Sequence, residues 1–539
     1  MSRRRSARNS RALPLAILAA LAIVIAALAM GSVRLDSATA DEGAHIASGI
    51  IKLRYGWLSF FPEQPPLMNV LTALPLGGFR MPPGWEDDRG RGGHWRAGHA
   101  LLYRAGNDAH RLLFLARLPT IALFLALCFA VYCVVSAEAG VAWGLVAFAL
   151  TGFCPNLLAH GRLATVDMAV TAFGFIAFTF LLRALRTHAL LDGALCGLFA
   201  MCAVLSKTSG VLIPPFLLAV ALFRAKEWKA LVKPMLAALV TAIALLYAIT
   251  FALASDSYLQ TAFPDTSRLL IPWLQYKQHV DAIRFWYAAG HEHPQFLLGR
   301  FSTTGWPHYY FVAFLLKTTL GAILLFVLAL VAARRTRSVA TYASLLFVAA
   351  FFAVSMTSHI DLGIRYILPV YPFLYTAIAI ALAKVVTETR RATAVGVLVA
   401  WHCMASLIAY PSYLSYFNEL IGGNRNADRF LIDSNLDWGQ DLRRLRLWCD
   451  ANHIPFIRID YFGGGDIRYE FGPRATRWDA PRPQPLPKGW FAVSRHFYRV
   501  SFDPHESPID YDTYLEASHA RYATTVGGSM DVYRVEGRN

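Results

Sequence analysis

DSATADEGAHIASGIIKLRYGWLSFFPEQPPLMNVLTALPL occupies residues 36–76, directly after the first long apolar segment of the chain. It is polar at its start, and it carries the carboxylates Asp41, Glu42 and Glu63. Loops held by a rigid scaffold are where binding and catalytic residues concentrate. A carboxylate-bearing loop beside hydrophobic segments therefore indicates a site at the surface of a membrane bundle.

Composition places the chain among membrane proteins. Of its 539 residues, 56% are hydrophobic and 16% are charged, whereas an average soluble domain carries about 25% charged residues. Windows of roughly 20 apolar residues recur, as in polytopic membrane proteins. The net charge of +16 does not indicate nucleic acid, because such proteins concentrate Lys and Arg in cytoplasmic loops.

We expect about eleven membrane-spanning helices. Residues 1–11 carry five Arg and place the N-terminus in the cytoplasm. An odd number of spans then puts the C-terminus outside, and the basic loops of the chain all fall on the cytoplasmic side of this count. The expected spans are 12–33, 112–134, 139–158, 164–185, 189–206, 209–223, 231–254, 309–333, 339–357, 364–383 and 393–410.

The sequence thus predicts a polytopic α-helical membrane protein of the bacterial plasma (inner) membrane in two parts. Residues 1–410 would form the transmembrane domain, with a large exoplasmic loop at 34–111 and a second one at 255–308. Residues 411–539 are soluble in composition and long enough for a small periplasmic α/β domain. In this domain we expect a helix at 441–452 and strands at 456–462, 490–500 and 530–535.

Asp41 is the first candidate catalytic residue. In a helix, Asp41 and His45 share one face at i and i+4, whereas Glu42 points about 100° away. A carboxylate within reach of a hydroxyl can take its proton as general base, and Glu42 or His45 could orient it. The alternative is structural: Thr39-x-x-Glu42 matches a capping box, and Asp41 would then only complement the helix dipole.

Glu63 and Gln64 precede two prolines, Pro65 and Pro66. The prolines end one segment and can begin a helix. Glu63 and Gln64 could bind the acceptor or the sugar, and a plain turn residue is the alternative reading of Glu63.

Four cations lie at or near the outer ends of expected spans, where the inside-positive bias normally depletes them. A charge at membrane depth is costly and usually functional, and a lipid phosphate needs such partners. Snorkelling to the headgroups is the alternative. Asp167 lies beside them and could pair with Arg162 or join the polar site. The four cations are Arg162, Lys207, Lys317 and Arg365.

Two patterns resemble metal sites without matching one. His291-Glu292-His293 is not an HExxH motif. Residues 433–437 resemble the start of a calcium loop, but Trp438 stands where Gly is needed, and we expect Asp437 to cap the following helix instead. We therefore predict no metal site, although Mg²⁺ could still assist a phosphate.

Eight stretches match motifs of a known family, in the order expected for that family. They are DEGAHIASG (41–49), PEQPPL (62–67), ARLPT (116–120), CPNLLAHGRLATVD (154–167), LSKTSG (205–210), FLLGRFSTTGW (296–306), LGIRYILPVYPF (362–373) and SYLSYFNELIGGNRNADRFLIDSNLDWGQDL (412–442). Together they resemble the bacterial phospholipid-carrier-dependent glycosyltransferases, relatives of the protein O-mannosyltransferases. The lipid A aminoarabinose transferases are a more distant likeness within the same C-type glycosyltransferase superfamily.

The resemblance implies a transmembrane bundle with active-site loops on the exoplasmic side, a polyprenyl-phosphate-linked sugar as donor, and inversion at the anomeric carbon. It maps the base onto Asp41, with Glu42 beside it in the acceptor site. Gln64 is a departure, because relatives often carry His before the two prolines. Gln64 cannot titrate near neutral pH, so hydrogen bonding is the role left to it.

This chemistry needs a base for the acceptor hydroxyl and cations for the departing phosphate, and it needs no cofactor. The acceptor could be a lipid, a protein or a glycan. Two alternative functions stay open: a flippase or transporter for lipid-linked sugars, which would place charges deep in several spans, and a polymerase or ligase of lipid-linked glycans, which uses the same kind of donor.

Overall fold

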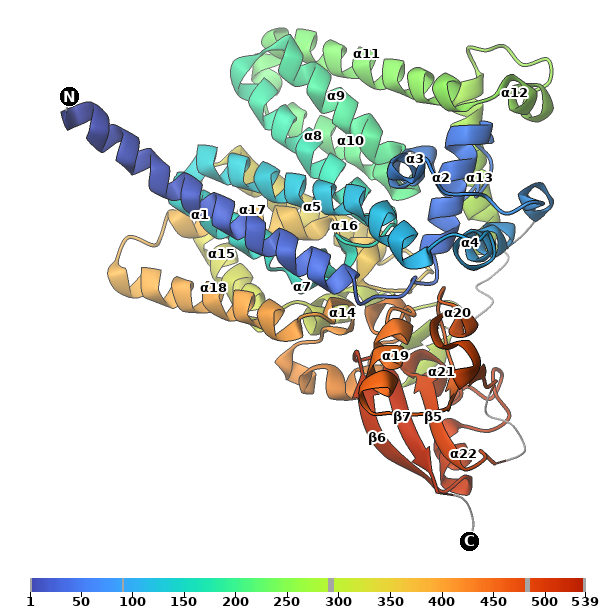
Figure 1. Cartoon of the computed structure of the whole chain (residues 1–539). Coiled ribbons are helices and arrows are strands. Elements are labelled where there is room, and N and C mark those ends of the chain that lie inside the picture. The colour runs from blue at the N-terminus through green and yellow to red at the C-terminus, as the bar shows by residue number, and fades with distance from the viewer. Residues whose placement is uncertain (1, 90–91, 289–294, 480–484, 537–539) are drawn as a thin grey trace.

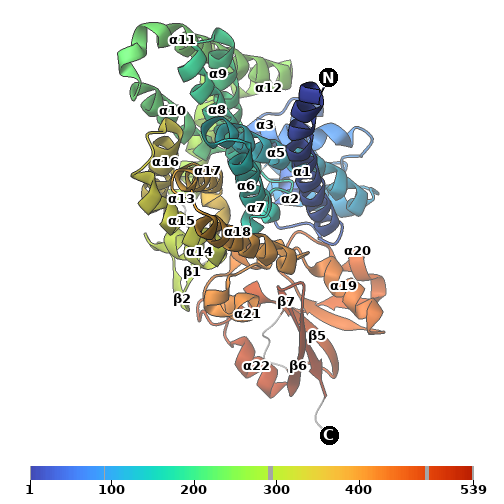
Figure 2. The ribbon, with the colours of Figure 1, turned by 90° about the vertical axis from the view of Figure 1, so that its left-hand side faces the viewer.

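The computed structural model describes residues 2–89, 92–288, 295–479 and 485–536. Helices fill the chain as far as residue 409, and a five-stranded sheet with short helices follows. Figures 1 and 2 show these as two adjoining parts, with the sheet at one end of the helical part. The chain is a mostly helical, multi-pass membrane protein.

Within the described residues, five helices are long and apolar enough to cross a membrane. Apolar runs of about 20 residues are what such a crossing requires, and each run ends close to charged or polar residues. The five are α1 (Ser2–Val33, apolar from Ala12), α5 (Ala109–Ala139), α8 (Asp167–Thr187), α11 (Trp228–Leu253) and α18 (Thr389–Ala409).

The other expected spans are shorter or broken helices, so the count of eleven spans stays a prediction. They comprise α6 (Val141–Gly152) with α7 (Pro155–His160), α9 (Leu190–Val204), the 3₁₀ turn η3 (Thr208–Leu212) with α10 (Ile213–Leu222), α14 (Tyr309–Lys317) with α15 (Leu320–Ala333), α16 (Val339–Ser355), and η5 (Ile364–Ile367) with α17 (Val370–Ala383).

The span expected at 309–333 is strongly bent, because α14 and α15 meet at 113°. Such a break frees backbone groups that must find other partners. Thr319 caps α15 by accepting a hydrogen bond from the backbone N–H of Ala322. The side-chain amide of Asn418 donates to the carbonyl of Thr318 at 2.8 Å. A later segment of the chain therefore stabilises the break.

The first outer loop folds as short helices over one end of the bundle. α2 (Glu42–Tyr55), α3 (Pro66–Ala73) and α4 (Gly93–Tyr103) form a compact group with their own buried core. The prolines predicted to begin a helix do so, because Pro66 is the first residue of α3. The second outer loop contains α12 (Asp256–Ala262), α13 (Ile271–Ala288), β1 (Gln295–Leu297) and β2 (Arg300–Ser302). The His291–His293 pattern lies outside the described residues.

The last part of the chain is a sheet between helices. Its strand order is β4-β3-β5-β7-β6; β4, β3 and β5 are parallel, and β7 and β6 continue antiparallel. The elements are α19 (Leu442–Ala451), β3 (Ile457–Asp460), α20 (Ile467–Phe471), β4 (Ala475–Arg477), β5 (Gly489–Ser494), α21 (Arg495–Val500), α22 (Tyr511–Ala517), β6 (Ala520–Val526) and β7 (Met530–Val535).

Two sequence predictions in this part are wrong. The strand expected at 490–500 ends at Ser494, whose side chain caps α21 by accepting from the N–H of Phe497. Asp437 does not cap α19, because Asp441 occupies that position. Asp437 instead accepts the backbone N–H groups of Gly439 and His496, at 3.1 and 3.2 Å.

The apolar core of the helical part continues beyond residue 410. Tyr413, Leu436 and Trp438 belong to it, whereas Leu442 begins the core of the sheet part. The chain between them runs back over the outer ends of the helices. This segment therefore adds residues to whatever lies at that end of the bundle.

Candidate active site

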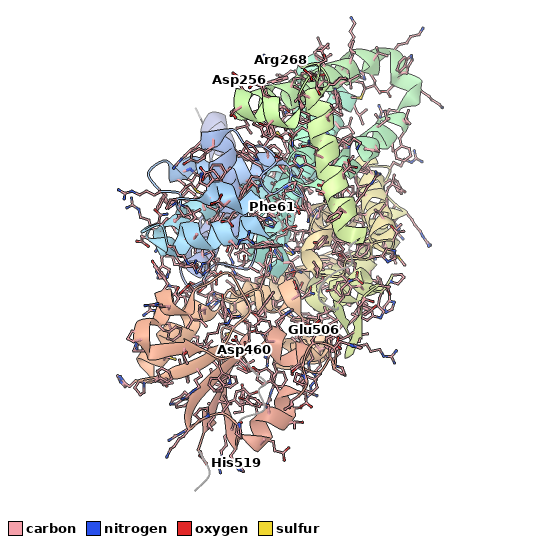
Figure 3. All side chains as sticks on the ribbon, turned by 90° about the vertical axis from the view of Figure 1, so that its right-hand side faces the viewer. Phe61, Asp256, Arg268, Asp460, Glu506 and His519 are labelled. Carbon is pink, nitrogen blue, oxygen red and sulfur yellow. The ribbon has the colours of Figure 1, made fainter. Side chains whose placement is uncertain are left out.

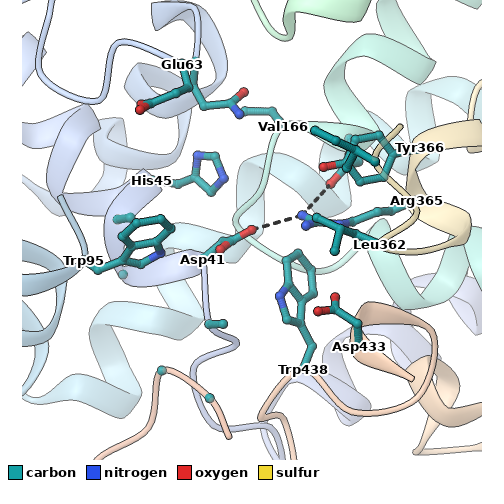
Figure 4. Close-up of a pocket in the computed structure, with 18 of the residues that line it drawn as sticks. Asp41, His45, Glu63, Trp95, Val166, Leu362, Arg365, Tyr366, Asp433 and Trp438 are labelled. Carbon is teal, nitrogen blue, oxygen red and sulfur yellow. Dashed lines mark hydrogen bonds and ion pairs between the residues drawn. The ribbon is translucent and has the colours of Figure 1, made fainter. Parts of the chain in front are cut away.

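A cavity of about 1180 Å³ lies where α2, α4, the ends of several bundle helices and the sheet part meet (Figure 4). Seven residues singled out in the sequence line it: Asp41, His45, Glu63, Gln64, Asp167, Lys207 and Arg365. They come from segments far apart in the chain. The fold therefore gathers most of the predicted site in one place.

Opposite charges alternate along one wall of the cavity. The guanidinium of Arg365 is 3.0 Å from a carboxylate oxygen of Asp41 and 3.9 Å from one of Asp167. The ammonium of Lys207 is 2.6 Å from the other oxygen of Asp167. The two cations also flank the ring of Tyr366, at 4.3 Å for Lys207 and 5.3 Å for Arg365. Asp167 thus holds both cations at the cavity, and Asp41 faces one of them.

Glu42 lies outside the cavity lining and is fully buried. Arg117 donates to its two carboxylate oxygens at 2.7 and 2.6 Å, and the backbone N–H groups of Ala164 and Thr39 donate at 2.8 and 3.0 Å. Burial raises the pKa of Glu42, but Arg117 and these hydrogen bonds outweigh it and hold the pKa below its usual value. The bond to Thr39 is one half of the capping box that the sequence offered as the alternative.

His45 reaches the cavity from the same face of α2 as Asp41, and a hydrogen-bond chain fixes its tautomer. The single hydroxyl proton of Ser48 is donated to the carbonyl of Phe60. Toward Asn69, 3.3 Å away, the Ser48 oxygen can therefore only accept, and it accepts from the amide nitrogen. The oxygen of Asn69 therefore faces Nδ1 of His45 at 2.9 Å, and Nδ1 must carry the proton. Burial lowers the pKa of His45. In the neutral ring, the lone pair is on Nε2.

Glu63 and Gln64 line the cavity on the loop before α3. Glu63 Oε2 and Gln64 Oε1 are buried and have no hydrogen-bond partner among the described residues. Lys52 lies beneath them, fully buried, and donates to Ser48 at 2.8 Å and toward the carbonyl of Gln64 at 3.5 Å. Burial lowers the pKa of Lys52 to about 7 and raises that of Glu63. Both carboxyl and amide oxygens can accept from a ligand hydroxyl.

Arg162 and Lys317 do not reach the cavity, although the sequence grouped them with the phosphate-binding cations. Arg162 is fully buried and pairs with Asp36, which also pairs with Arg444 at 2.5 Å. Lys317 donates to the carbonyls of Leu414 and Asn435, at 2.7 and 2.5 Å. Both cations therefore join the helical bundle or the outer loop to the segment after residue 410.

Several cavity residues were missed in the sequence as site residues. Asp433 lines the cavity in a left-handed backbone conformation, with φ of 56°, and burial raises its pKa to about 6. Asp361 is 3% exposed, its pKa is also raised to about 6 by burial, and it accepts the N–H of Trp306 at 2.6 Å. The LGIRYILPVYPF and DSNLDWGQ motifs contain or flank these residues, so their position in the motifs was the only available signal.

Aromatic side chains complete the cavity wall. Trp438 lies against Arg365, with the guanidinium carbon 4.1 Å from the ring centre. Trp95 lies on the other side of Asp41 (Figure 4). Aromatic faces next to a carboxylate suit a sugar, because its apolar C–H face can lie on a ring while its hydroxyls hydrogen-bond.

Two of the carboxylates that line this cavity already have cationic partners. No group of three or more His, Cys, Asp or Glu side chains able to hold a metal ion occurs among the residues that the structure describes. The carboxylates of Asp41 and Asp167 are instead paired with Arg365 and Lys207. We derive no step through a metal.

Comparisons with solved structures find matches at low sequence identity. ArnT from Cupriavidus metallidurans in the apo state is 12% identical, with a TM-score of 0.49, and the match covers 97% of this chain and 99% of that one. The same protein bound to undecaprenyl phosphate is 13% identical with the same TM-score and coverage. The archaeal oligosaccharyltransferase AglB from Archaeoglobus fulgidus, in complex with an inhibitory peptide and a dolichol-phosphate, is 12% identical with a TM-score of 0.45, covering 98% of this chain and 74% of that one.

No curated protein sequence matches the chain at a significant level. A family model does match: residues 109–253 correspond to the dolichyl-phosphate-mannose-protein mannosyltransferases. This range runs from the start of α5 to the end of α11 and contains the motifs at 116–120, 154–167 and 205–210, with Arg117, Asp167 and Lys207. The family resemblance drawn from the sequence is thereby confirmed over this segment of the chain.

Proposed function

We propose that this protein is a glycosyltransferase that moves a sugar from a polyprenyl-phosphate carrier to an acceptor hydroxyl. The observation that carries the proposal is the cavity at the end of an apolar bundle in which a carboxylate, Asp41, faces the cation Arg365, while Asp167 holds a second cation, Lys207, in the same lining. A lipid-linked donor needs a site that its tail can reach from the bilayer while its phosphate and sugar stay in a polar cavity.

Asp41 is the proposed general base. As the acceptor oxygen forms its bond to the anomeric carbon, its proton passes to the Asp41 carboxylate. The bond between that carbon and the phosphate oxygen breaks, and the phosphate keeps the electron pair. Attack and departure occur on opposite faces of the carbon, so the configuration inverts.

Arg365 and Lys207 are the proposed phosphate ligands. Fixed cations aimed at the place where charge develops stabilise the transition state without reorganising. Asp167 keeps both cations at the cavity through contacts of 3.9 and 2.6 Å. Departure of a lipid phosphate, already a good leaving group, then needs no general acid.

His45, Glu63 and Gln64 are the proposed sugar or acceptor ligands. Nε2 of His45, Oε2 of Glu63 and Oε1 of Gln64 all accept hydrogen bonds, and a sugar offers several hydroxyl donors. Glu42 takes a positioning role in this proposal, because its pair with Arg117 fixes the start of α2 and so the place of Asp41.

The topology inferred from the sequence gives the orientation. We propose that residues 1–410 form the transmembrane domain and residues 411–539 a periplasmic domain, with the N-terminus in the cytoplasm and the cavity on the periplasmic side of the bacterial plasma membrane. The donor is then a polyprenyl phosphate-linked hexose or pentose.

Mass spectrometry of envelope proteins, lipids and glycans tests the function. Three strains are compared: wild type, a deletion, and one carrying Asp41→Asn. We expect a hexose- or pentose-sized mass to disappear in both mutant strains. Loss of whole glycan chains would indicate a polymerase or ligase. No lost sugar, with lipid-linked precursors redistributed across the membrane, would contradict the proposal and favour a flippase.

A further inference from the structure

The sheet part meets the cavity by one end only. Asp460, the last residue of β3, lies toward the helical part, whereas His519, just before β6, lies at the far end (Figure 3). The segments that line the cavity follow the carboxyl ends of the parallel strands: residues 461–464 follow β3, Arg477 ends β4, and residues 496–497 follow β5.

At that end of the sheet, the loops that follow β3 and β5 leave in opposite directions. β3 lies between β4 and β5, so the chain leaves β3 toward one side, while β5 stands on the other. Loops that leave adjacent parallel strands in opposite directions open a crevice outside the carboxyl ends, which is where open α/β sheets bind ligands. Phe462 and His496 come from these two loops, and their rings stack at 4.0 Å.

A second cavity of about 680 Å³ adjoins the first, between α4 and the segment that leads from β3 to β4. His99, Tyr461, Gly463 and Arg477 line both cavities. His99 extends from α4 and pairs with Asp466 at 3.1 Å. The active site is therefore continuous with a polar crevice between α4 and the sheet part.

The crevice begins on the side of Asp41 opposite the cations. Trp95 and His99 lie four residues apart on one face of α4, and Figure 4 shows Asp41 between Trp95 and Arg365. If Arg365 holds the departing phosphate, an acceptor that attacks in line must come from the Trp95 side. This step rests on the proposed function.

We propose that this crevice is the acceptor site and that the acceptor is a saccharide. Sugars present hydroxyls at their edges and apolar C–H faces, and the crevice supplies a matching series. Trp95 and Phe462 offer ring faces, while His99, Asp466 and Arg477 offer hydrogen-bonding groups of both kinds. A peptide acceptor would favour a long free strand edge, and the edge strand β4 is three residues long.

Two pairs of variants test the crevice in the purified full-length protein, each with a matched control. The first pair is Phe462→Leu, in the loop after β3, and its control Phe456→Leu, just before β3. Phe456 is 38% exposed and lies outside both cavities. Arg477→Ala lies on one edge strand, and Arg521→Ala lies on the opposite edge strand β6. The assay measures transfer of labelled sugar from a polyprenyl phosphate donor to membranes of a strain that lacks the protein.

We expect Phe462→Leu and Arg477→Ala each to raise the KM for the membrane acceptor at least tenfold. Binding of undecaprenyl phosphate, measured separately by thermal stabilisation, should be unchanged, and both controls should transfer as wild type does. Equal KM values in the crevice variants and the controls would overturn the acceptor site. Failure of the wild-type protein to transfer any sugar would instead contradict the proposed function.

The labelled product decides the acceptor class. After proteinase digestion and extraction with organic solvent, label in the aqueous carbohydrate fraction indicates a free glycan, and label in the solvent phase indicates a glycolipid headgroup. Both are saccharides and support the proposal. Label recovered in peptides would overturn it.

Discussion

Replacing Glu42 by glutamine distinguishes the role of Glu42 from that of the adjacent carboxylate Asp41 at the start of α2. Glu42 is fully buried and accepts five hydrogen bonds, two of them from Arg117. The amide of glutamine places an NH₂ group where Arg117 needs an acceptor, and it leaves the guanidinium charge without a counter-ion. Breaking such a buried pair costs about 3–5 kcal/mol, which shifts the folding equilibrium by a factor of roughly 10² to 10⁴.

Asp41→Asn provides the matched comparison. The Asp41 side chain is 22% exposed and its contact with Arg365 is 3.0 Å long, and partly exposed pairs contribute about 0–1 kcal/mol. We expect this variant to unfold close to the wild-type temperature and to lose transfer by about 10²- to 10⁴-fold, the usual contribution of a general base. Glu42→Gln should instead lower the Tm clearly and reduce transfer less than Asp41→Asn does, because a displaced start of α2 moves the Asp41 carboxylate without removing it.

The measurement follows tryptophan fluorescence on heating the purified protein, with transfer assayed well below the transition. The pH dependence adds a check. The folded protein holds the pKa of Glu42 below its usual value, so this stability is present at neutral pH and is lost as the pH falls through the lowered pKa. A Glu42→Gln variant that is inactive but as stable as wild type at every pH would refute the positioning role.

Three further predictions concern other parts of the site. Lys207→Ala should weaken undecaprenyl phosphate binding at least tenfold in a thermal-stabilisation titration, and Lys229→Ala serves as the control; equal affinities would remove Lys207 from the donor site. Burial raises the pKa of Asp361 to about 6, so the folded state binds its proton more tightly and stability should fall as the pH rises from about 4 to 6; Asp361→Asn should flatten that slope in denaturation curves, and an unchanged slope would contradict the assignment. A Cβ on Gly464 would lie 2.3 Å from the carbonyl oxygen of Thr39, so Gly464→Ala should displace the start of α2 and lower transfer, whereas Gly78→Ala, with open space around it, should not.

The sequence predicts the membrane class of the chain and most of the cavity, because apolar run length and motif order are local properties. Asp41, Asp167, Lys207 and Arg365 were singled out by residue type and by position at span ends, and the fold brings all four together. Their pairing was not predictable, since each partner lies more than a hundred residues from Asp41.

Other features depend on tertiary contacts that leave no local signal. The bend between α14 and α15 is stabilised by Asn418, about a hundred residues later. The capping of α21 by Ser494 ends a segment whose apolar residues otherwise favour a strand. Asp433 reaches the cavity because its segment returns across the outer helix ends, and a left-handed backbone conformation at this residue is not visible in a sequence.

The four cations that the sequence grouped together have two different roles in the structure. Burying a cation costs free energy, so a buried cation usually has a structural or functional role. From the sequence, we expected all four to bind the lipid phosphate. In the structure, Lys207 and Arg365 share Asp167 at the cavity, whereas Arg162 and Lys317 hold Asp36 and two backbone carbonyls. The second pair fixes the segment after residue 410 against the bundle, and that segment supplies Asp433 and Trp438 to the cavity. The joint and the site therefore depend on each other: in our proposal, the cations that do not touch substrate are the ones that bring the two parts close enough for donor and acceptor to meet at Asp41.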